Sequence, residues 1–420
     1  MARLVETIAP ARLGSGFRWL LASSWVTNLG DGIALAAGPL LIASQTHDPR
    51  VVALAALLNW APQLLLGLYA GALADRLDRR LIVVSVNLVR AGVLVLLATS
   101  IVTGVVSVPV VLGSLFLLGC AEVFADNTSS TLLPMLLGRA DLGLGNSRLM
   151  SGFITLNQLA GPPVGAALFA AGSAWPFVTQ AVLVLAGAGL VSRIVLPPHG
   201  RAPDQRAHLR ADVLEGFRWV WRHAAVRTLI LTIFTFNITF GAAWSVLVLY
   251  ATQRLHLGAV GFGLLTTASA LGGIAGTSAY GWITRRVSLG NLMRIGLLLE
   301  TLTHLCLALT TSPAVALVIF FVFGAHAFIW GTTSATVRQR AVPTELQGRV
   351  GGVNMLGVCG GLVIGAAIGG PLARYGGVTA PFWFAFAGSA LFVVLIWGQL
   401  VHIAHDDLPV ENPETDGSPA

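Results

Sequence analysis

Residues 71–80 of this chain read GALADRLDRR, and this stretch decides how the rest of the sequence is interpreted. Long apolar runs flank it on both sides. Only 10% of the whole chain is charged, yet ten positions here hold five charges: Asp75, Arg76, Asp78, Arg79 and Arg80. A short charged break between two long apolar runs predicts a loop that turns the chain back at a membrane surface.

The composition indicates an integral membrane protein. Of 420 residues, 55% are hydrophobic and the mean hydropathy is +0.80, whereas a soluble domain keeps about a quarter of its residues charged. All 25 basic side chains are Arg, so a lysine-dependent phosphate loop is absent and ATP-driven transport by this chain is disfavoured. The three Cys stand singly, and no metal or hydrolase motif appears. We therefore expect no enzyme, cofactor or metal.

Twelve apolar stretches are each close to the roughly 20 residues that a helix needs to cross a bilayer. They predict an all-α membrane protein with twelve transmembrane helices. The stretches cover residues 17–43, 51–74, 81–102, 107–127, 148–172, 175–195, 227–252, 259–283, 290–310, 313–335, 350–373 and 379–402.

Arginine is concentrated in alternate loops. Twenty-one of the 25 arginines lie in the N-terminal segment or after even-numbered stretches, whereas the opposite loops hold only Arg50, Arg254 and Arg374. Positive side chains accumulate on the cytoplasmic side of a membrane. We therefore expect a multi-pass protein of the cytoplasmic membrane with both termini in the cytoplasm. The net charge of +7 is then a consequence of topology and not a sign of nucleic-acid binding.

The two halves of the chain share landmarks at one spacing. Gly161 and Gly369 lie 208 residues apart, as do Asn146 and Asn354. A repeat of this kind predicts two pseudo-symmetric six-helix bundles. The expected parts are an N-terminal bundle (1–195), a cytoplasmic linker with an amphipathic helix (196–226), a C-terminal bundle (227–402) and a disordered acidic tail (403–420).

Glycines with GxxxG spacing fall on stretches two, five, eight and eleven. This spacing lets two membrane helices approach until their backbones touch. We expect these four helices to hold interfaces within and between the bundles, through Gly67, Gly71, Gly161, Pro162, Gly165, Gly272, Gly276, Gly357, Gly361, Gly365 and Gly369.

Ionisable residues within apolar stretches are costly and are candidates for function. Asp31 lies near the middle of stretch one, while Glu122 and Asp126 are four residues apart on stretch four. All three are proton-coupling candidates, because a desolvated carboxyl can exchange a proton. Two structural alternatives remain open: Asp31 in an ion pair, and Glu122 as the partner of Arg90, for which it is the nearest acid by topology. Asp126 lies nearer the cytoplasmic end, where a salt bridge is equally plausible.

Stretches seven, nine and ten also carry polar and aromatic residues. Glu300 and His304 are spaced one turn apart on stretch nine, which predicts a stabilising mutual contact. The candidates for a cavity lining are Asn28, Asn237, Trp244, Tyr250, His326, Phe328 and Trp330; for each of them, ordinary packing is the alternative.

At this point the chain resembles the major facilitator superfamily. GALADRLDRR is similar to the signature between helices two and three of that family, with Asp78 where a Gly is usual, and GPPVG at 161–165 is similar to its antiporter signature. DGIALAAGPLL and AEVFADNTSSTLLP resemble the branch that contains enterobactin and macrolide exporters. The resemblance implies alternating access by rocking of two halves. It also implies an inner gate, which we assign to Asp75, Arg76, Arg79, Arg80 and Asp126.

The sequence thus predicts a secondary active transporter of the cytoplasmic membrane. We expect a monomer that exports small amphipathic compounds, such as drugs, siderophores or secondary metabolites, in exchange for protons. A facilitator or importer of the same fold is the alternative within the family. A membrane receptor or scaffold that does not transport is the alternative outside it, and buried carboxylates argue against that alternative.

Overall fold

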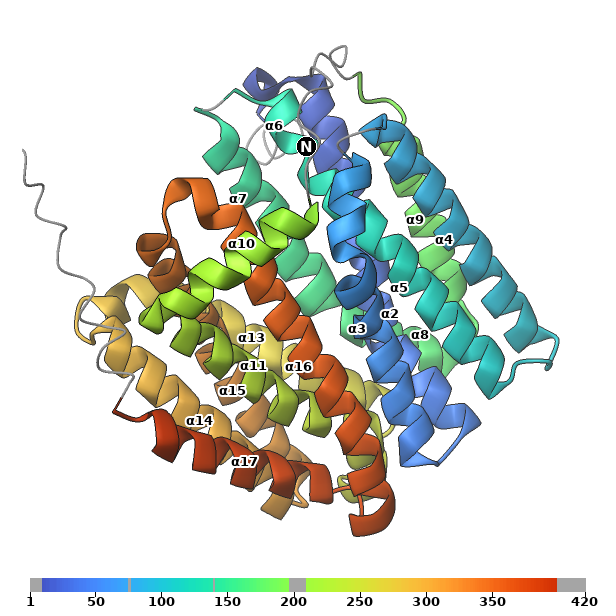
Figure 1. Cartoon of the computed structure of the whole chain (residues 1–420). Coiled ribbons are helices and arrows are strands. Elements are labelled where there is room, and N and C mark those ends of the chain that lie inside the picture. The colour runs from blue at the N-terminus through green and yellow to red at the C-terminus, as the bar shows by residue number, and fades with distance from the viewer. Residues whose placement is uncertain (1–9, 75–76, 139, 196–208, 399–420) are drawn as a thin grey trace, which may run out of the picture.

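The computed structural model describes residues 10–74, 77–138, 140–195 and 209–398 (Figure 1). Two residues of the predicted inner gate, Asp75 and Arg76, lie outside the described residues. So do the expected acidic tail at 403–420 and residues 196–208 of the linker. Within the described residues the chain is helical, and no strand occurs.

The first half of the chain forms six membrane-crossing segments. After a short turn of 3-10 helix, η1 (Ala11–Leu13), the first four are single helices. The fifth is continuous but changes from α-helix to π-helix and back. The segments are α2 (Gly14–Gln45), α3 (Pro49–Ala74), α4 (Arg79–Val102), α5 (Val108–Ser130), the composite α7 (Leu142–Gly152), η2 (Phe153–Ala160) and α8 (Gly161–Ala171), and α9 (Trp175–Val191), with the short α6 (Leu133–Leu136) after α5.

The second half repeats this plan after the amphipathic helix α10 (Leu209–Arg222). Its first segment is interrupted. The segments are α11 (Ala224–Trp244), which continues through α12 (Leu247–Leu249) and the π-helix η3 (Tyr250–Arg254), α13 (Ala259–Thr284), α14 (Leu289–Leu309), α15 (Pro313–Ala341), α16 (Gln347–Gly376) after the 3-10 turn η4 (Thr344–Leu346), and α17 (Ala380–Ile396).

Nine of the described helices are long and apolar enough to cross a membrane, and α9 and α17 are shorter apolar helices. With the composite fifth segment they give twelve spans. The predicted all-α architecture of two six-helix bundles is confirmed. In Figure 1 the bundles lie side by side, and α3 and α16 run next to each other between them.

The charged turn after α3 starts the next helix. Asp78 is the N-cap of α4, and its carboxylate accepts hydrogen bonds from the backbone N–H groups of Arg80 at 2.9 Å and Leu81 at 3.3 Å. An N-cap of this kind stabilises a helix by about 1 kcal/mol. Asp78, which departs from the family pattern, therefore has a local structural role.

Three pairs of helices meet backbone to backbone through glycine. A Cβ added at Gly165 on α8 would lie within 3.0 Å of the Ile33 backbone on α2. The same holds for Gly276 on α13 against α15, and for Gly365 on α16 against α11. Real Cβ atoms are essentially never found this close, so any larger residue at these positions must displace the facing backbone. Four more of the predicted packing glycines have such an approach: Gly161, Gly272, Gly361 and Gly369.

These glycine contacts lie inside single bundles. Between the bundles, α3 contacts α16 and α8 contacts α13, so the four helices hold interfaces of both kinds, as expected. At Gly67 the atoms nearest to an added Cβ belong to the Gln63 side chain of its own helix, so a role of Gly67 in helix packing stays a prediction. Gly357 makes ordinary contact at 3.5 Å with Ile230. The surroundings of Gly71 lie outside what the structure describes. Each bundle is thus stiffened internally by its glycines.

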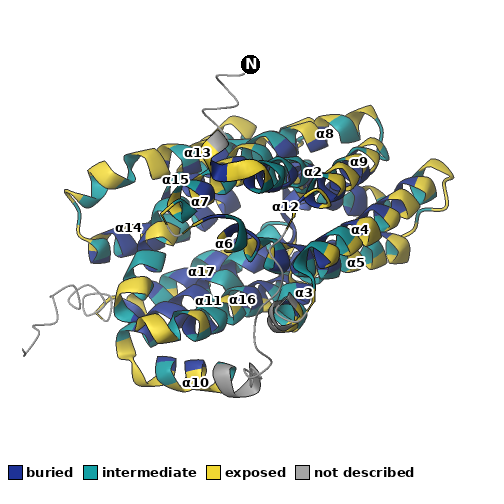
Figure 2. Ribbon diagram, turned by 90° about the horizontal axis from the view of Figure 1, so that it is seen from above, coloured by how far each residue is buried: buried dark blue, intermediate teal, exposed yellow. Residues whose placement is uncertain are grey.

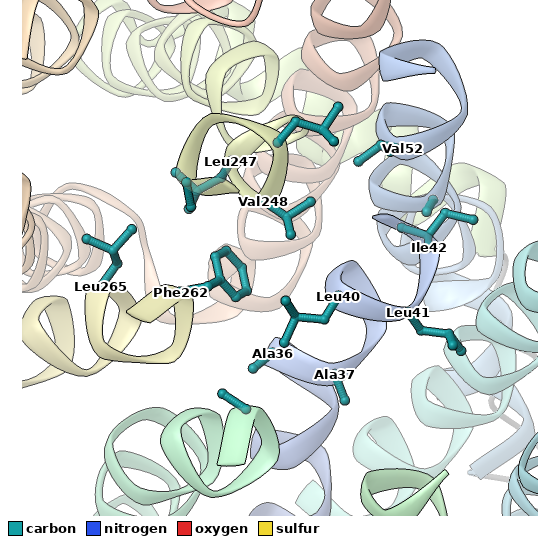
Figure 3. Packing of buried hydrophobic residues seen from close by; sticks show 14 of the residues in the cluster. Ala36, Ala37, Leu40, Leu41, Ile42, Val52, Leu247, Val248, Phe262 and Leu265 are labelled. Atoms are coloured by element: carbon teal, nitrogen blue, oxygen red, sulfur yellow. The ribbon is translucent and has the colours of Figure 1, made fainter. Parts of the chain in front are cut away.

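The bundles touch each other at the ends remote from the first residues of α2 and α11. Leu247 and Val248 of α12 share a buried cluster with Leu40 of α2 (Figure 3). A Cβ at Gly263 on α13 would lie 2.7 Å from the Ala166 side chain on α8, and one at Gly370 on α16 would lie 2.9 Å from Ala53 on α3. Small residues close this end of the molecule, which we call the outer seal.

Candidate functional site

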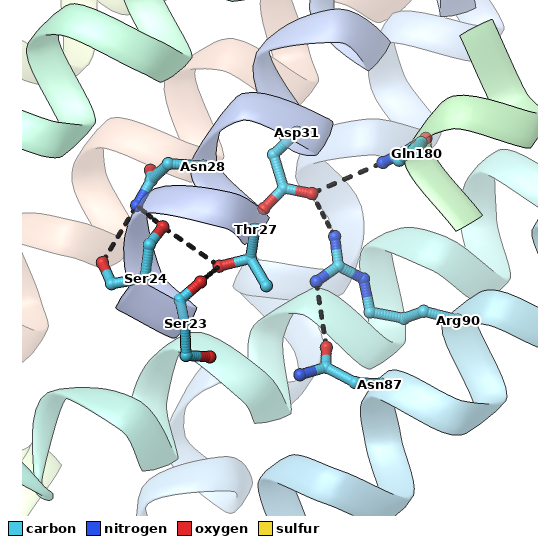
Figure 4. Close-up of polar contacts among 8 residues, drawn as sticks. All are labelled: Ser23, Ser24, Thr27, Asn28, Asp31, Asn87, Arg90 and Gln180. Carbon is cyan, nitrogen blue, oxygen red and sulfur yellow. Dashed lines mark hydrogen bonds and ion pairs between the residues drawn. The ribbon is translucent and has the colours of Figure 1, made fainter. Parts of the chain in front are cut away.

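An ion pair between the first and third spans lies inside the N-terminal bundle. Arg90 Nη2 on α4 pairs with Asp31 Oδ1 on α2, and the Arg90 side chain is 3% exposed (Figure 4). Of the two structural alternatives, the ion pair of Asp31 is therefore the one present, and Arg90 does not pair with Glu122. The order of the spans did not predict this partner. α4 packs directly against α5, which carries Glu122, but the long side chain of Arg90 reaches Asp31 on α2.

Two amides complete this polar group. Arg90 Nη1 donates to Asn87 Oδ1 at 3.3 Å, and Gln180 Nε2 on α9 donates to Asp31 Oδ1 at 3.4 Å. Neither amide was among the predicted residues. Asn87 lies three residues before Arg90, an i, i+3 spacing that places both on one face of a helix and was a usable signal. For Gln180 the sequence offered no signal except that a polar residue lies within an apolar stretch.

Asn28 serves its own helix. Its Nδ2 donates to the Ser24 carbonyl at 2.7 Å and to Ser24 Oγ at 3.1 Å. The side chain is part-buried. Its assignment as a cavity residue stays a prediction.

The π-helix η2 lies directly against the residue after Asp31. A Cβ at Gly32 would lie within 3.0 Å of the Asn157 backbone in η2, so the backbones of α2 and η2 touch without any side chain between them. π-Helices appear frequently at functional sites. η2 also contacts α13 of the other bundle, so the same segment touches both the Asp31 region and the partner bundle.

The two carboxylates of α5 have no such partner. Within the described residues, neither Glu122 nor Asp126 makes a hydrogen bond or an ion pair. Both carboxylates nevertheless act electrostatically on Arg90, as Asp31 does. Three carboxylates thus share one arginine, and two negative charges lack a protein countercharge when all three are ionised.

Of the predicted inner gate, the structure describes Arg79, Arg80 and Asp126. Arg80 Nη1 donates to the Ile194 carbonyl at 3.3 Å, and Arg79 Nη1 lies 2.8 Å from Met135 Sδ. Both arginines thus contact the N-terminal bundle itself, and neither pairs with Asp126. The role of these residues in a gate stays a prediction.

A second polar group lies in the C-terminal bundle. The Glu300 carboxylate on α14 faces two imidazoles: His304 Nε2 lies 3.3 Å from Oε1, and His326 Nε2 on α15 lies 3.1 Å from Oε2. The expected Glu300–His304 contact is present. The addition of His326 was missed, because no sequence spacing relates residues on two different spans. No group suited to hold a metal ion occurs among the described residues.

Aromatic rings surround this second group. Trp244 packs against Phe240 with ring centroids 4.3 Å apart and against Phe323 at 4.8 Å, and it meets His304 edge to face at 6.0 Å. Tyr250 is fully buried, and its hydroxyl donates to the Leu307 carbonyl at 2.6 Å. The prediction that Tyr250 lines a cavity is therefore wrong.

Three other candidates pack inside the bundle. A Cβ at Gly273 would lie 2.6 Å from the Phe328 ring, and one at Gly296 would lie 2.5 Å from the Trp330 ring. Asn237 Nδ2 donates to the Ile233 carbonyl at 2.7 Å. All three are part-buried, so a role in binding substrate stays a prediction for each.

Comparisons with known proteins agree with this architecture. A family profile described as Major Facilitator Superfamily matches residues 20–361. The enterobactin exporter EntS of Escherichia coli O1:K1 / APEC is 26% identical over 391 residues, which cover 92% of this chain and 90% of the relative. EntS of Citrobacter koseri is 25% identical over 412 residues, covering 96% and 95%.

Solved structures show the same fold. A bacterial homologue of the iron transporter ferroportin, in an inward-facing state, superposes with a TM-score of 0.72 at 17% identity, covering 93% of this chain and 98% of that one. The nucleoside transporter NupG gives 0.71 at 12% identity, covering 92% and 98%. At these identities the likeness concerns the fold alone.

Proposed function

This chain belongs to the major facilitator superfamily, and from that premise we propose that it exports small amphipathic compounds in exchange for protons. It is a multi-pass membrane transport protein and not an enzyme. We place it in the cytoplasmic membrane with both termini in the cytoplasm, on the strength of its arginine distribution.

The unpaired carboxylates of α5 carry the proposal. Asp31 has a permanent countercharge in Arg90, whereas Glu122 and Asp126 have none among the described residues. Glu122 is part-buried and Asp126 is exposed. The charge of a part-buried carboxylate without a partner is expensive, and a proton is the smallest ion that removes it. We assign proton exchange to Glu122, with Asp126 as a second carrier, and assign Asp31 to holding Arg90 beside them.

The direction of transport rests on two observations of different kinds. The relatives named enterobactin exporters favour efflux of a small amphipathic compound, such as a siderophore, a drug or a secondary metabolite. With cytoplasmic termini, the outer seal is the extracellular gate, so this conformation would be open inward and ready to load from the cytoplasm. Rocking of the two bundles would then close the cytoplasmic side, where the predicted gate residues Arg80 and Asp126 of the N-terminal bundle lie.

A facilitator or importer of the same fold is the second candidate. Facilitated transport needs no carboxylate that changes charge during the cycle, and Glu122 and Asp126 therefore favour exchange. A scaffold without transport activity is disfavoured for the same reason, since it gains nothing from unpaired carboxylates in the membrane.

Efflux from everted vesicles tests the proposal. A panel of siderophores, macrolides and other amphipathic compounds is measured with and without an imposed proton gradient. At least one compound should accumulate only with the gradient, and Glu122→Gln should reduce that accumulation about tenfold or more, equivalent to about 1.4 kcal/mol in the barrier. Glu345→Gln at an exposed position is the matched control. Accumulation that ignores the gradient, or survives Glu122→Gln unchanged, contradicts the proposal.

A further inference from the structure

Three titratable side chains meet in the C-terminal bundle, apart from the α5 carboxylates. Glu300 and His304 lie one turn apart on α14, and His326 comes from α15. Each carboxylate oxygen of Glu300 faces a different imidazole, at 3.3 Å and 3.1 Å. A simple salt bridge with the Glu300 carboxylate would need only one of the two histidines.

The three side chains are enclosed by the protein, and their net charge depends on how many protons they bind. The side chains of His304, His326 and Glu300 are 0%, 6% and 12% exposed. One protonated imidazole neutralises the carboxylate, and a second proton leaves the group with a charge of +1. Histidine is the side chain that changes charge near neutral pH, so the group can hold one or two exchangeable protons. Glu300 is the member most accessible for their arrival.

Other charged groups of the surrounding helices are already engaged or distant. Arg294 lies over the Trp397 ring at 5.1 Å and Tyr280 contacts Thr333, while α17 carries no titratable residue. The charged ends of α11 and α15 lie at least 12 residues along their helices from the group, about 18 Å. The titratable groups concerned, besides the exposed Cys306, are Arg227, Tyr280, Arg294, Arg338 and Arg340.

An aromatic contact joins this group to the outer seal. His304 meets the ring of Trp244 at 6.0 Å and 85°. Trp244 is the last residue of α11, and the chain leaves the helix there before α12 contacts α2 of the other bundle. An aromatic ring attracts a cation more strongly than a neutral ring. Protonation of His304 therefore changes a contact at the break that positions the seal.

We propose that Glu300, His304 and His326 form a proton-binding site, separate from Glu122 and Asp126, whose second proton strengthens the contact of His304 with Trp244. The site goes beyond the proposed function, which needs only the α5 carboxylates. It makes the outer seal respond to pH on its own account, without a transported compound.

Nitrogen NMR of the full-length protein tests this site directly. The protein carries ¹⁵N-labelled histidine in lipid nanodiscs, and His304→Gln and His326→Gln assign the two signals. At pH 7.5 one of the two imidazoles should be protonated, and at pH 5 both. Glu300→Gln should leave both neutral at pH 7.5, whereas His223→Gln at an exposed position should alter neither signal.

Trp244→Leu keeps all three members of the site and tests the link to the seal. It should raise the proton concentration needed for the second proton about threefold, as expected for the loss of a cation–π contact. Imidazoles that stay neutral from pH 8 to pH 5, or a titration unchanged in both Glu300→Gln and Trp244→Leu, would overturn the proposal. Because no transported compound enters the measurement, its outcome is independent of the vesicle assay.

Discussion

Each bundle encloses one carboxylate, but the partners of the two carboxylates differ. In the N-terminal bundle Asp31 pairs with Arg90, whose charge is permanent, whereas in the C-terminal bundle Glu300 faces two histidines, whose charge follows pH. Removal of the acid should therefore have unequal consequences. Arg90 cannot discard its charge, but His304 and His326 can release a proton and remain buried as neutral rings.

The largest effect is expected in the N-terminal bundle. Asp31→Asn leaves the Arg90 guanidinium buried without its carboxylate, and the free energy of unfolding should fall by about 3–5 kcal/mol. Denaturant unfolding of the purified protein in mixed micelles measures it. Asp141→Asn, which breaks the exposed pair with Arg12, should cost less than about 1 kcal/mol. Equal costs for the two variants would show that Arg90 is not confined as described.

Glycine substitutions test whether the bundles are equally stiff. Gly165→Ala in the N-terminal bundle and Gly272→Ala in the C-terminal bundle each press a methyl group onto a facing backbone, which should cost about 1–3 kcal/mol. Gly113→Ala and Gly281→Ala have nothing within 4 Å of the added carbon and serve as controls, one in each bundle. The same unfolding measurement applies, and a cost as large in the controls would refute the backbone contact.

Glu300→Gln is the counterpart of Asp31→Asn and should cost far less. Because both histidines can become neutral, the expected loss is about 1 kcal/mol, the scale of one hydrogen-bonding group. The unfolding free energy of both variants is measured at pH 8. A cost at pH 8 equal to that of Asp31→Asn would remove the distinction between the two bundles.

The smallest effect is expected at the outer loop between α2 and α3. Hydrogen bonds from Arg50 lower the pKa of Asp48 from 3.8 to about 2. A carboxyl with a lowered pKa in the folded protein stabilises it above about pH 4, and this stabilisation is lost as the pH falls towards 2. Wild-type Tm should therefore drop slightly more than that of Asp48→Asn between pH 5 and pH 2. Identical pH profiles would assign no stability to this exposed pair.

The sequence predicted the spans better than the contacts between them. Hydropathy and the placement of arginine predict where helices cross the membrane, because the length and apolar composition of each span are set by the bilayer. Helix ends extend past the apolar stretches: α15 continues to Ala341 because polar residues at the membrane surface remain helical. The partner of Arg90 could not be predicted, since it depends on how α2 and α4 pack. For the same reason His326 was not joined to Glu300.

The linker helix has a consequence for how the protein is made. Glu215 of α10 pairs with Arg349 at 2.9 Å, and Gly216 of α10 lies against the Arg349 backbone on α16. Figure 2 shows α10 at one edge of the molecule, with exposed and buried positions along it. Arg349 is synthesised 134 residues after Glu215. The contact between α10 and α16 therefore cannot form until the start of α16 has left the ribosome. A chain that stops before α16 leaves Val220 of α10 without Val350 and Val353, with which it forms a buried cluster.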